Sequence, residues 1–314
     1  MGAYALRRLL AMIPVFLGAT LIIFLVTHLV PGDPVRLLSG QRALDPVRTE
    51  TIRHQLWLDR PLHVQYLHYL DGVVHGDLGL SYQRGRPVAD ILGEKFPNTA
   101  RLALAAVFLE VIIGVAAGII AAVRKASFLD TLVTVSTSLL VALPVFWLGL
   151  LLQLLFGVAL GILPVSGMGD GGLQYYILPS FTLASVSAAY VARLMRSQLL
   201  ETMGEDFVRT ARAKGLSERQ AVGRHALRAA ILPVLTFVAV DLGALLGGAV
   251  LTETVFNWPG IGYEIVLAIG QRDYPIVIGG AIFLVLVFLL INLVVDILYG
   301  VIDPRIRLRA REVS

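Results

Sequence analysis

The sequence contains no cysteine, and only 15% of its 314 residues are charged, whereas about a quarter of a typical soluble domain is. The absence of cysteine excludes disulfides, thiolate metal sites and a cysteine nucleophile, and it leaves the redox compartment undetermined. The shortage of charge, with a mean hydropathy of +0.78, favours a protein that lies in a membrane. In such a protein the net charge of +4 reports topology and does not indicate nucleic-acid binding.

Motifs for catalysis and nucleotide binding are also absent. No Gly-x-x-x-x-Gly-Lys-Ser/Thr phosphate loop occurs, so the chain has no ATPase site of that kind. No Ser/His/Asp set, zinc motif or pair of carboxylates has a usable spacing. Several histidines lie between residues 54 and 75, but their spacings match no zinc pattern. We therefore predict no catalytic residue, no metal site and no cofactor bound by this chain.

Six long apolar runs dominate the sequence, each near the ~20 residues that a helix needs to cross a bilayer. The first is longer than the apolar region of a signal peptide and ends in Pro-Gly-Asp-Pro, a poor cleavage sequence, so we interpret it as a retained helix. Pro144 is expected to kink the third. The predicted fold class is therefore all-α, a polytopic membrane protein with six transmembrane helices. These cover residues 9–30, 102–123, 132–157, 175–192, 233–256 and 275–301.

Basic residues set the expected orientation. Arginine and lysine gather before the first run, between the second and third, between the fourth and fifth, and after the sixth, whereas residues 161–174 carry none. The positive-inside rule then places both termini in the cytoplasm. The loop 31–98 carries basic residues on the outer side, which the rule tolerates in loops longer than about 60 residues.

These patterns divide the chain into three parts. Residues 1–98 hold the first helix and an extracytoplasmic loop domain, which we expect to fold as a small helical appendage. Residues 99–302 form a core of five helices with a cytoplasmic loop at about 201–230, and residues 303–314 form a cytoplasmic tail.

The cytoplasmic loop carries local helix signals. Thr202 with Glu205, and Ser217 with Gln220, have the spacing of a capping box. Gly215 lies between these two starts, where the residue after a helix end needs a positive φ. We predict a helix, a glycine turn and a second helix, with Ala211 and Ala213 keeping the surface before the turn flat for another protein.

The segment Arg209-Thr-Ala-Arg-Ala-Lys-Gly-Leu-Ser217 resembles the coupling loop of binding-protein-dependent ABC importer permeases, most of all the dipeptide/oligopeptide branch. The glutamate that opens the family's general motif is absent, which leaves the docking inference intact but weakens any claim of a specific glutamate contact. Further signatures follow in the family's order over nearly the whole chain: Pro31-Gly-Asp-Pro34, Gly76-Asp-Leu-Gly79, Pro144-Val-Phe-Trp147, Glu253-Thr-Val-Phe-Asn-Trp-Pro-Gly260, Arg272-Asp-Tyr-Pro275 and Asn292-Leu-Val-Val-Asp296.

The resemblance implies a type I ABC importer permease fold, a first-permease (B-type) subunit, and a place in a bacterial cytoplasmic membrane. The implied partners are a second homologous permease, ABC ATPase subunits that bind ATP and Mg²⁺, an extracytoplasmic solute-binding protein and the lipid bilayer. The residues implied to couple to the ATPase are Glu205, Asp206, Arg209, Thr210, Ala211, Ala213, Lys214, Gly215, Leu216 and Ser217. Those implied for an outer loop, under the binding protein or at a gate, are Glu253, Phe256, Trp258, Pro259, Gly260 and Asp273.

Two questions stay open at this point. Peptides are the expected cargo, with glutathione or nickel complexes as alternatives within the branch, and an ion-gradient secondary transporter is the alternative from another class. The latter predicts inverted repeats and midplane ion ligands, and neither is evident. The polar residues in or near the apolar runs form either a substrate or proton path or interhelical hydrogen bonds; we favour the second for Glu110, Gln153, Asp241, Asn292 and Asp296.

Overall fold

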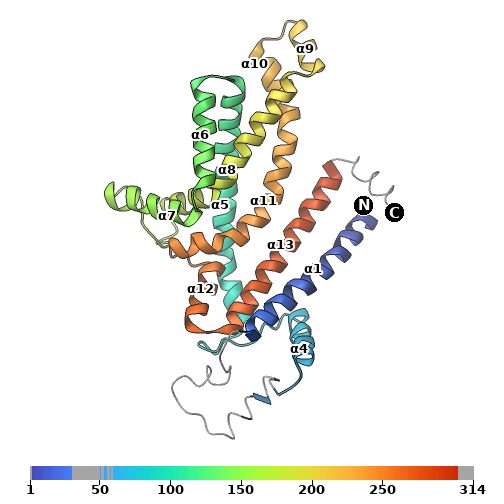
Figure 1. Ribbon diagram of the computed structural model, residues 1–314, viewed down its shortest axis with the longest axis vertical. Helices are drawn as coiled ribbons and strands as arrows, with labels where there is room; N and C mark the ends of the chain where they lie inside the picture. Colours follow the sequence, from blue (N-terminus) through green and yellow to red (C-terminus); the bar gives the residue numbers. More distant parts are fainter. Residues whose placement is uncertain (1, 30–49, 51–52, 55–56, 58, 303–314) are drawn as a thin grey trace. The chain divides into compact units, whose positions relative to one another are not determined.

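The computed structural model describes residues 2–29, 50, 53–54, 57 and 59–302 (Figure 1). In this part of the chain the regular elements are helices, apart from one isolated antiparallel bridge between Leu80 and Pro87. Five helices are long and apolar enough to cross a membrane, or six spans if one bent pair counts as a span. The all-α polytopic prediction is therefore confirmed. The five long helices are α1 (Gly2–Leu29), α5 (Val88–Val123), α8 (Gln174–Met203), α11 (Leu227–Val255) and α13 (Tyr274–Ile302).

The third predicted span is broken in the structure. Helix α6 (Phe128–Ala142) and helix α7 (Val145–Leu152), which continues as the π-helix η1 (Gln153–Ala159), meet at 107°. Leu143 between them is extended, with φ −85° and ψ 133°, because the residue before a proline is disfavoured in the helical region. Pro144 therefore breaks the run into two segments instead of kinking one helix.

Contacts divide the chain into two units. The first consists of Met1–Asn98 and Pro259–Leu293. It holds helices α4 (Leu62–Val74) and α12 (Ile261–Gln271). The side chain of Thr20 on α1 lies 2.9 Å from the hydroxyl of Tyr66 on α4, so the described part of the predicted appendage is helical and rests on the first helix. The buried core of this unit is formed by Val88, Ile91, Leu92, Ile261, Ile265, Ala268 and Ile276.

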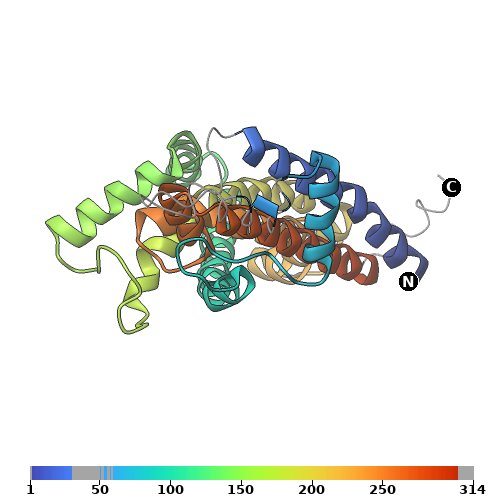
Figure 2. The ribbon, with the colours of Figure 1, turned by 90° about the horizontal axis from the view of Figure 1, so that it is seen from below.

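The second unit consists of Thr99–Trp258 and Val294–Ser314. Helix α8 packs against α6, α7 and α11 (Figure 1). In the view of Figure 2, the α7–η1 segment extends away from these helices. A Cβ added at Gly114 would lie 2.6 Å from Val191, and one at Gly118 would lie 2.6 Å from Met195. The helix backbones therefore approach closely at this Gly-x-x-x-Gly pair. Gly247 has open space around it, so the second such spacing does not have that role at this glycine.

Candidate functional site

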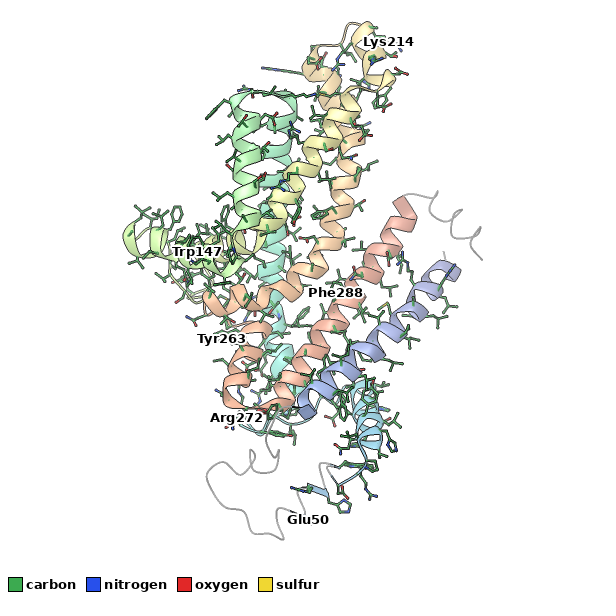
Figure 3. The ribbon with its side chains drawn as sticks, in the orientation of Figure 1. Glu50, Trp147, Lys214, Tyr263, Arg272 and Phe288 are labelled. Carbon is green, nitrogen blue, oxygen red and sulfur yellow. The ribbon has the colours of Figure 1, made fainter. Side chains whose placement is uncertain are left out.

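The predicted cytoplasmic loop contains a short helix that ends in a glycine turn. Helix α9 (Asp206–Ala213) is followed by Gly215 with φ +87°. The Gly215 N–H donates to the Arg212 carbonyl at 2.9 Å, and the Leu216 N–H donates to the Ala211 carbonyl at 3.3 Å. These two bonds form a Schellman motif, which requires a left-handed residue after the helix end. Figure 3 shows Lys214 at this turn, at the far end of the α8–α11 pair. The predicted glycine turn is confirmed.

One of the two predicted caps is present. Ser217 and Gln220 form a capping box, in which the Ser217 N–H donates to Gln220 Oε1 at 3.2 Å. Helix α10 (Glu218–Gln220) then continues through the π-helix η2 (Ala221–Ala226) into α11.

The cap predicted at Thr202 is wrong. Helix α8 extends through Met203, and Thr202 Oγ1 donates to the Gln198 carbonyl at 2.7 Å, within that helix. Threonine hydroxyls in helices often bond to the carbonyl four residues back. The residue before α9 is Glu205, which makes no side-chain cap bond.

Two buried side chains anchor helix α9 to the rest of the second unit. Val208 is fully buried and Ala211 nearly so, and Val208 shares a core with Met195 and Leu199 of α8 and with residues of η2. Arg212 donates to both carboxylate oxygens of Glu218, at 2.9 and 2.7 Å, and to the Met203 carbonyl at 3.2 Å. These contacts fix α9 to the ends of α8 and α11.

The outer side of α9 remains available for a partner. Ala211 faces the core, so only Ala213 contributes to the flat surface that the sequence suggested for both alanines. Leu216 is half-buried. The other predicted coupling residues are exposed: Glu205, Asp206, Arg209, Thr210, Ala213, Lys214, Gly215 and Ser217.

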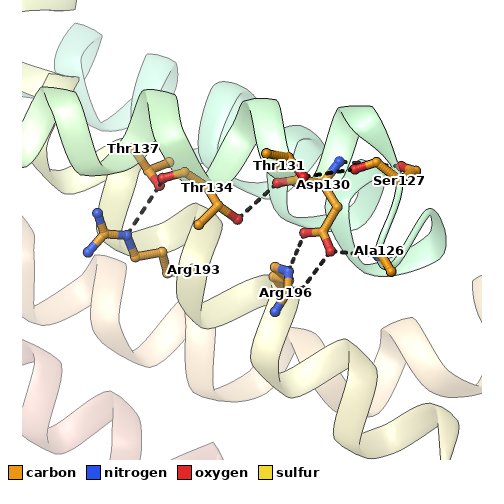
Figure 4. A network of polar contacts seen from close by, with 8 residues as sticks. All are labelled: Ala126, Ser127, Asp130, Thr131, Thr134, Thr137, Arg193 and Arg196. Atoms are coloured by element: carbon orange, nitrogen blue, oxygen red, sulfur yellow. Dashed lines mark hydrogen bonds and ion pairs between the residues drawn. The ribbon is translucent and has the colours of Figure 1, made fainter.

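A polar network at the α5–α6 connection braces α8 (Figure 4). The buried carboxylate of Asp130 accepts from Arg196 Nε at 2.7 Å, from Arg196 Nη2 at 2.8 Å and from the Ala126 N–H at 2.9 Å. One turn away, Arg193 Nε donates to Thr137 Oγ1 at 3.2 Å. Both arginines belong to the basic residues between the fourth and fifth apolar runs, which were interpreted only as topology signals. Ser127 caps α6, since its Oγ accepts from the Asp130 N–H at 3.4 Å. The Ser127-x-x-Asp130 spacing is a local signal for such a cap, but it does not indicate the arginine partner on α8.

Three of the predicted outer-loop residues are buried in the second unit. Glu253 accepts from Thr99 Oγ1 at 2.7 Å and is fully buried. Phe256 and Trp258 are also buried, and Trp258 packs edge-on against Tyr176 with ring centroids 4.7 Å apart. Their side chains position the segment and offer no surface for a direct contact.

The other three lie in the first unit, at a corner built on a buried carboxylate. Asp273 accepts from Ser81 Oγ at 2.5 Å, from the Tyr82 N–H at 3.0 Å and from the Gln83 N–H at 3.2 Å. Burial, with a smaller contribution from Asp273, raises the pKa of Tyr82 to about 12. Pro259 accepts from Asn98 through its carbonyl, and Gly260 is buried.

The same corner holds an ion pair that the sequence did not suggest. Arg84 pairs with the buried carboxylate of Glu264. Next to Asp273, Arg272 is exposed and left-handed with φ 56°. The carboxylates of Asp273 and Glu264 thus hold the residue 81–84 turn against the α12–α13 corner, which leaves Arg272 at the surface.

The polar residues of the apolar helices differ from one another. Gln153 donates to the carbonyls of Val165 at 2.8 Å and Val255 at 3.0 Å, which confirms an interhelical bond there. Asn292 bonds to the Phe288 carbonyl of its own helix. Glu110 is fully buried, and neither of its carboxylate oxygens has a hydrogen-bond partner among the described residues. Among the described residues no interhelical bond is found for Asn292 or Glu110, so for these two the interhelical interpretation stays a prediction.

Comparison with known proteins places this geometry in a family. Residues 114–308 match the family described as binding-protein-dependent transport system inner membrane component, and residues 1–103 match the N-terminal part of such membrane components. The chain is 45% identical to the glutathione transport system permease protein GsiC of Escherichia coli K12, over 97% of this chain and 98% of that protein. It is 39% identical to the dipeptide transport system permease protein DppB of the same strain, over 97% and 98% of the two chains.

Solved structures support the fold alone. The inward-facing methionine ABC transporter MetNI contains a chain that matches with a TM-score of 0.55 at 20% identity, over 68% of this chain and 96% of that one. An amino acid ABC transporter matches with a TM-score of 0.52 at 16% identity, over 69% and 94%. Taken with the apolar helices and the sequence matches, these findings mean that the chain belongs to the binding-protein-dependent transport system inner membrane components and is a multi-pass inner-membrane permease subunit.

Proposed function

We propose that this permease subunit passes peptides across the cytoplasmic membrane, driven by ATP that separate ATPase subunits hydrolyse. The observation that carries the proposal is helix α9, which is fixed to α8 and α11 through Val208 and presents an exposed polar side beside the Gly215 turn. A short rigid helix on the ends of two long ones suits a docking element, because force applied to it is transmitted to the long helices instead of deforming a loop.

The mechanism is a lever. An ATPase pair that closes around ATP and Mg²⁺ moves α9, and the buried contacts of Val208 and Ala211 carry this motion to α8 and α11. Switching then consists of rigid-body motion of packed helices between outward and inward openings. The Asp130–Arg196 pair ties α6 into the same moving group.

The remaining partners follow from the proposed importer. A second homologous permease completes the pathway, and a solute-binding protein delivers cargo on the outer side, with both termini of this chain in the cytoplasm. At the outer corner we assign Asp273 a positioning role, because its carboxylate is buried, while Arg272 beside it is exposed and free to face the binding protein.

Peptide cargo is favoured because the two curated relatives are named for dipeptide and glutathione transport, and glutathione is itself a small peptide derivative. Glutathione is the second, more specific candidate, because the chain is more similar to the glutathione permease than to the dipeptide permease. Measuring the uptake of each labelled compound separately, in the same vesicles, shows which of the two is the preferred cargo.

The test is transport by the complete complex in proteoliposomes, with its companion permease, ATPases and binding protein. We expect uptake of a labelled dipeptide or of glutathione that requires ATP on the ATPase side and persists when ion gradients are dissipated. Omitting the companion permease should abolish it. Uptake that follows an ion gradient without ATP, or transport by this subunit and one ATPase alone, would contradict the proposal.

A further inference from the structure

A groove of about 770 Å³ lies beside helix α9, where α11 begins. Three basic side chains, Arg224, His225 and Arg228, line it together with apolar ones from α9, the turn and α11: Phe207, Leu216, Ala229 and Leu232. All of these residues belong to the second unit. The groove therefore combines positive charge with apolar walls.

The arginines of the groove are available to a ligand. Arg212 and Arg196 each pair with a carboxylate, at 2.7 Å. Among the described residues, neither Arg224 nor Arg228 has a hydrogen bond or an ion pair, and both side chains are exposed. Two neighbouring guanidinium groups with no acidic partner form a site for an anion, and guanidinium binds phosphate oxygens in a two-pronged geometry.

The apolar walls indicate what the anion is attached to. Arg228, Leu232 and Leu235 are spaced i, i+4 and i+7 and so follow one face of α11. Leu232 is 54% exposed and Leu235 50% exposed. The face thus changes from basic to apolar within two turns, which matches the change from headgroup to acyl chain at a membrane surface.

We infer that this groove binds the headgroup of an anionic phospholipid of the inner leaflet, with its phosphate on Arg224 and Arg228 and an acyl chain along Leu232 and Leu235. The inference rests on the proposed placement of the loop at the cytoplasmic surface. Basic pockets at that level bind anionic lipid headgroups. A lipid bound there would contact Phe207 of α9 and so would help to hold α9 against α11.

The absence of cysteine makes the test direct. A fluorophore on Leu235→Cys, in the purified full chain in detergent, is titrated with brominated phosphatidylglycerol or brominated phosphatidylcholine. We expect quenching by phosphatidylglycerol at much lower concentration. Because a basic residue near an anionic surface contributes a factor of about five, Arg224→Gln and Arg228→Gln should each weaken this binding about fivefold. Arg219→Gln, an exposed arginine of the same loop outside the groove, should leave it unchanged.

Three outcomes would overturn the inference. They are equal quenching by phosphatidylcholine, full competition by inorganic phosphate, and displacement of the lipid by the ATPase subunit, which would make the groove a protein interface. Added salt should weaken phosphatidylglycerol binding to the unsubstituted chain, because screening reduces the attraction of exposed charges. This second measurement holds even if an arginine variant fails to fold. ATPase attachment at α9 without lipid binding would remove this inference and leave the proposed function in place.

Discussion

Replacing Gly215 with valine is expected to lower ATP-driven transport roughly tenfold, while the protein still inserts into the membrane. Gly215 has φ +87°, and a Cβ at this position would meet nothing within 4 Å. The effect is therefore conformational. A left-handed backbone costs an L-residue roughly 1–2 kcal/mol, and a β-branched side chain resists it most. The Schellman turn is then distorted, and α9 loses the orientation in which it docks. The measurements are ATP-driven uptake in proteoliposomes and substrate-stimulated ATP hydrolysis by the purified complex, and we expect both to fall.

Two further variants make this prediction specific. Gly223 is also exposed, with open space for a Cβ and without a positive φ, so Gly223→Val is the matched control and should retain coupling. Gly215→Asn should recover much of the activity, because asparagine tolerates the left-handed region. Wild-type stimulation in Gly215→Val, or an equal loss in Gly223→Val, would show that the turn does not couple the ATPase.

Removing the carboxylate of Asp130 is expected to lower the thermal midpoint of the complex by several degrees and to reduce transport with it. Asp130→Ala leaves the Arg196 guanidinium without its bidentate acceptor and the Ala126 N–H, at φ 61°, without its bond. Unpaired groups of this kind are among the recognised causes of large destabilisation. The measurement is thermal unfolding of the purified complex in detergent.

The control for Asp130 lies on the same turn of helix. Thr131 donates to the Ser127 carbonyl at 3.2 Å from an exposed position, so Thr131→Ala should change the midpoint little. Arg196→Lys should destabilise part-way, because an ammonium group cannot reproduce the two-pronged bond. If Asp130→Ala and Thr131→Ala had the same midpoint, the Asp130–Arg196 pair would not stabilise the fold.

Features set by neighbouring residues were predicted well from sequence. The Gly215 turn and the Ser217–Gln220 capping box depend on backbone conformation within a few residues. The span lengths were predicted less well, since α5 and α8 are 36 and 30 residues long and extend beyond the predicted ranges 102–123 and 175–192. Thr202 shows the limit of this reasoning. Its capping pattern was present, but α8 continues past it to Met203, which packs against the same core as Val208 of α9.

Features set by distant contacts were not predicted. Trp258 was expected in an outer loop under the binding protein or at a gate, yet its ring packs on Tyr176, 82 positions away by residue number. The angle at Pro144 is of the same kind: proline predicts a break, but the direction of α7 depends on contacts such as those of Gln153 with the carbonyls of Val165 and Val255. Arg84 and Glu264 lie 180 residues apart, and no local pattern links them.

The most direct test of the central claim is photocrosslinking from α9. Ala213 is exposed beside the turn and the chain has no cysteine, so Ala213→Cys accepts a single cysteine-directed photocrosslinker. Val74 on α4, which is 76% exposed, provides the matched probe site on the predicted outer loop. We predict that the probe at position 213 forms an adduct with the ATPase subunit and that the probe at position 74 does not. An adduct of position 213 with the binding protein, or of position 74 with the ATPase, would contradict the account.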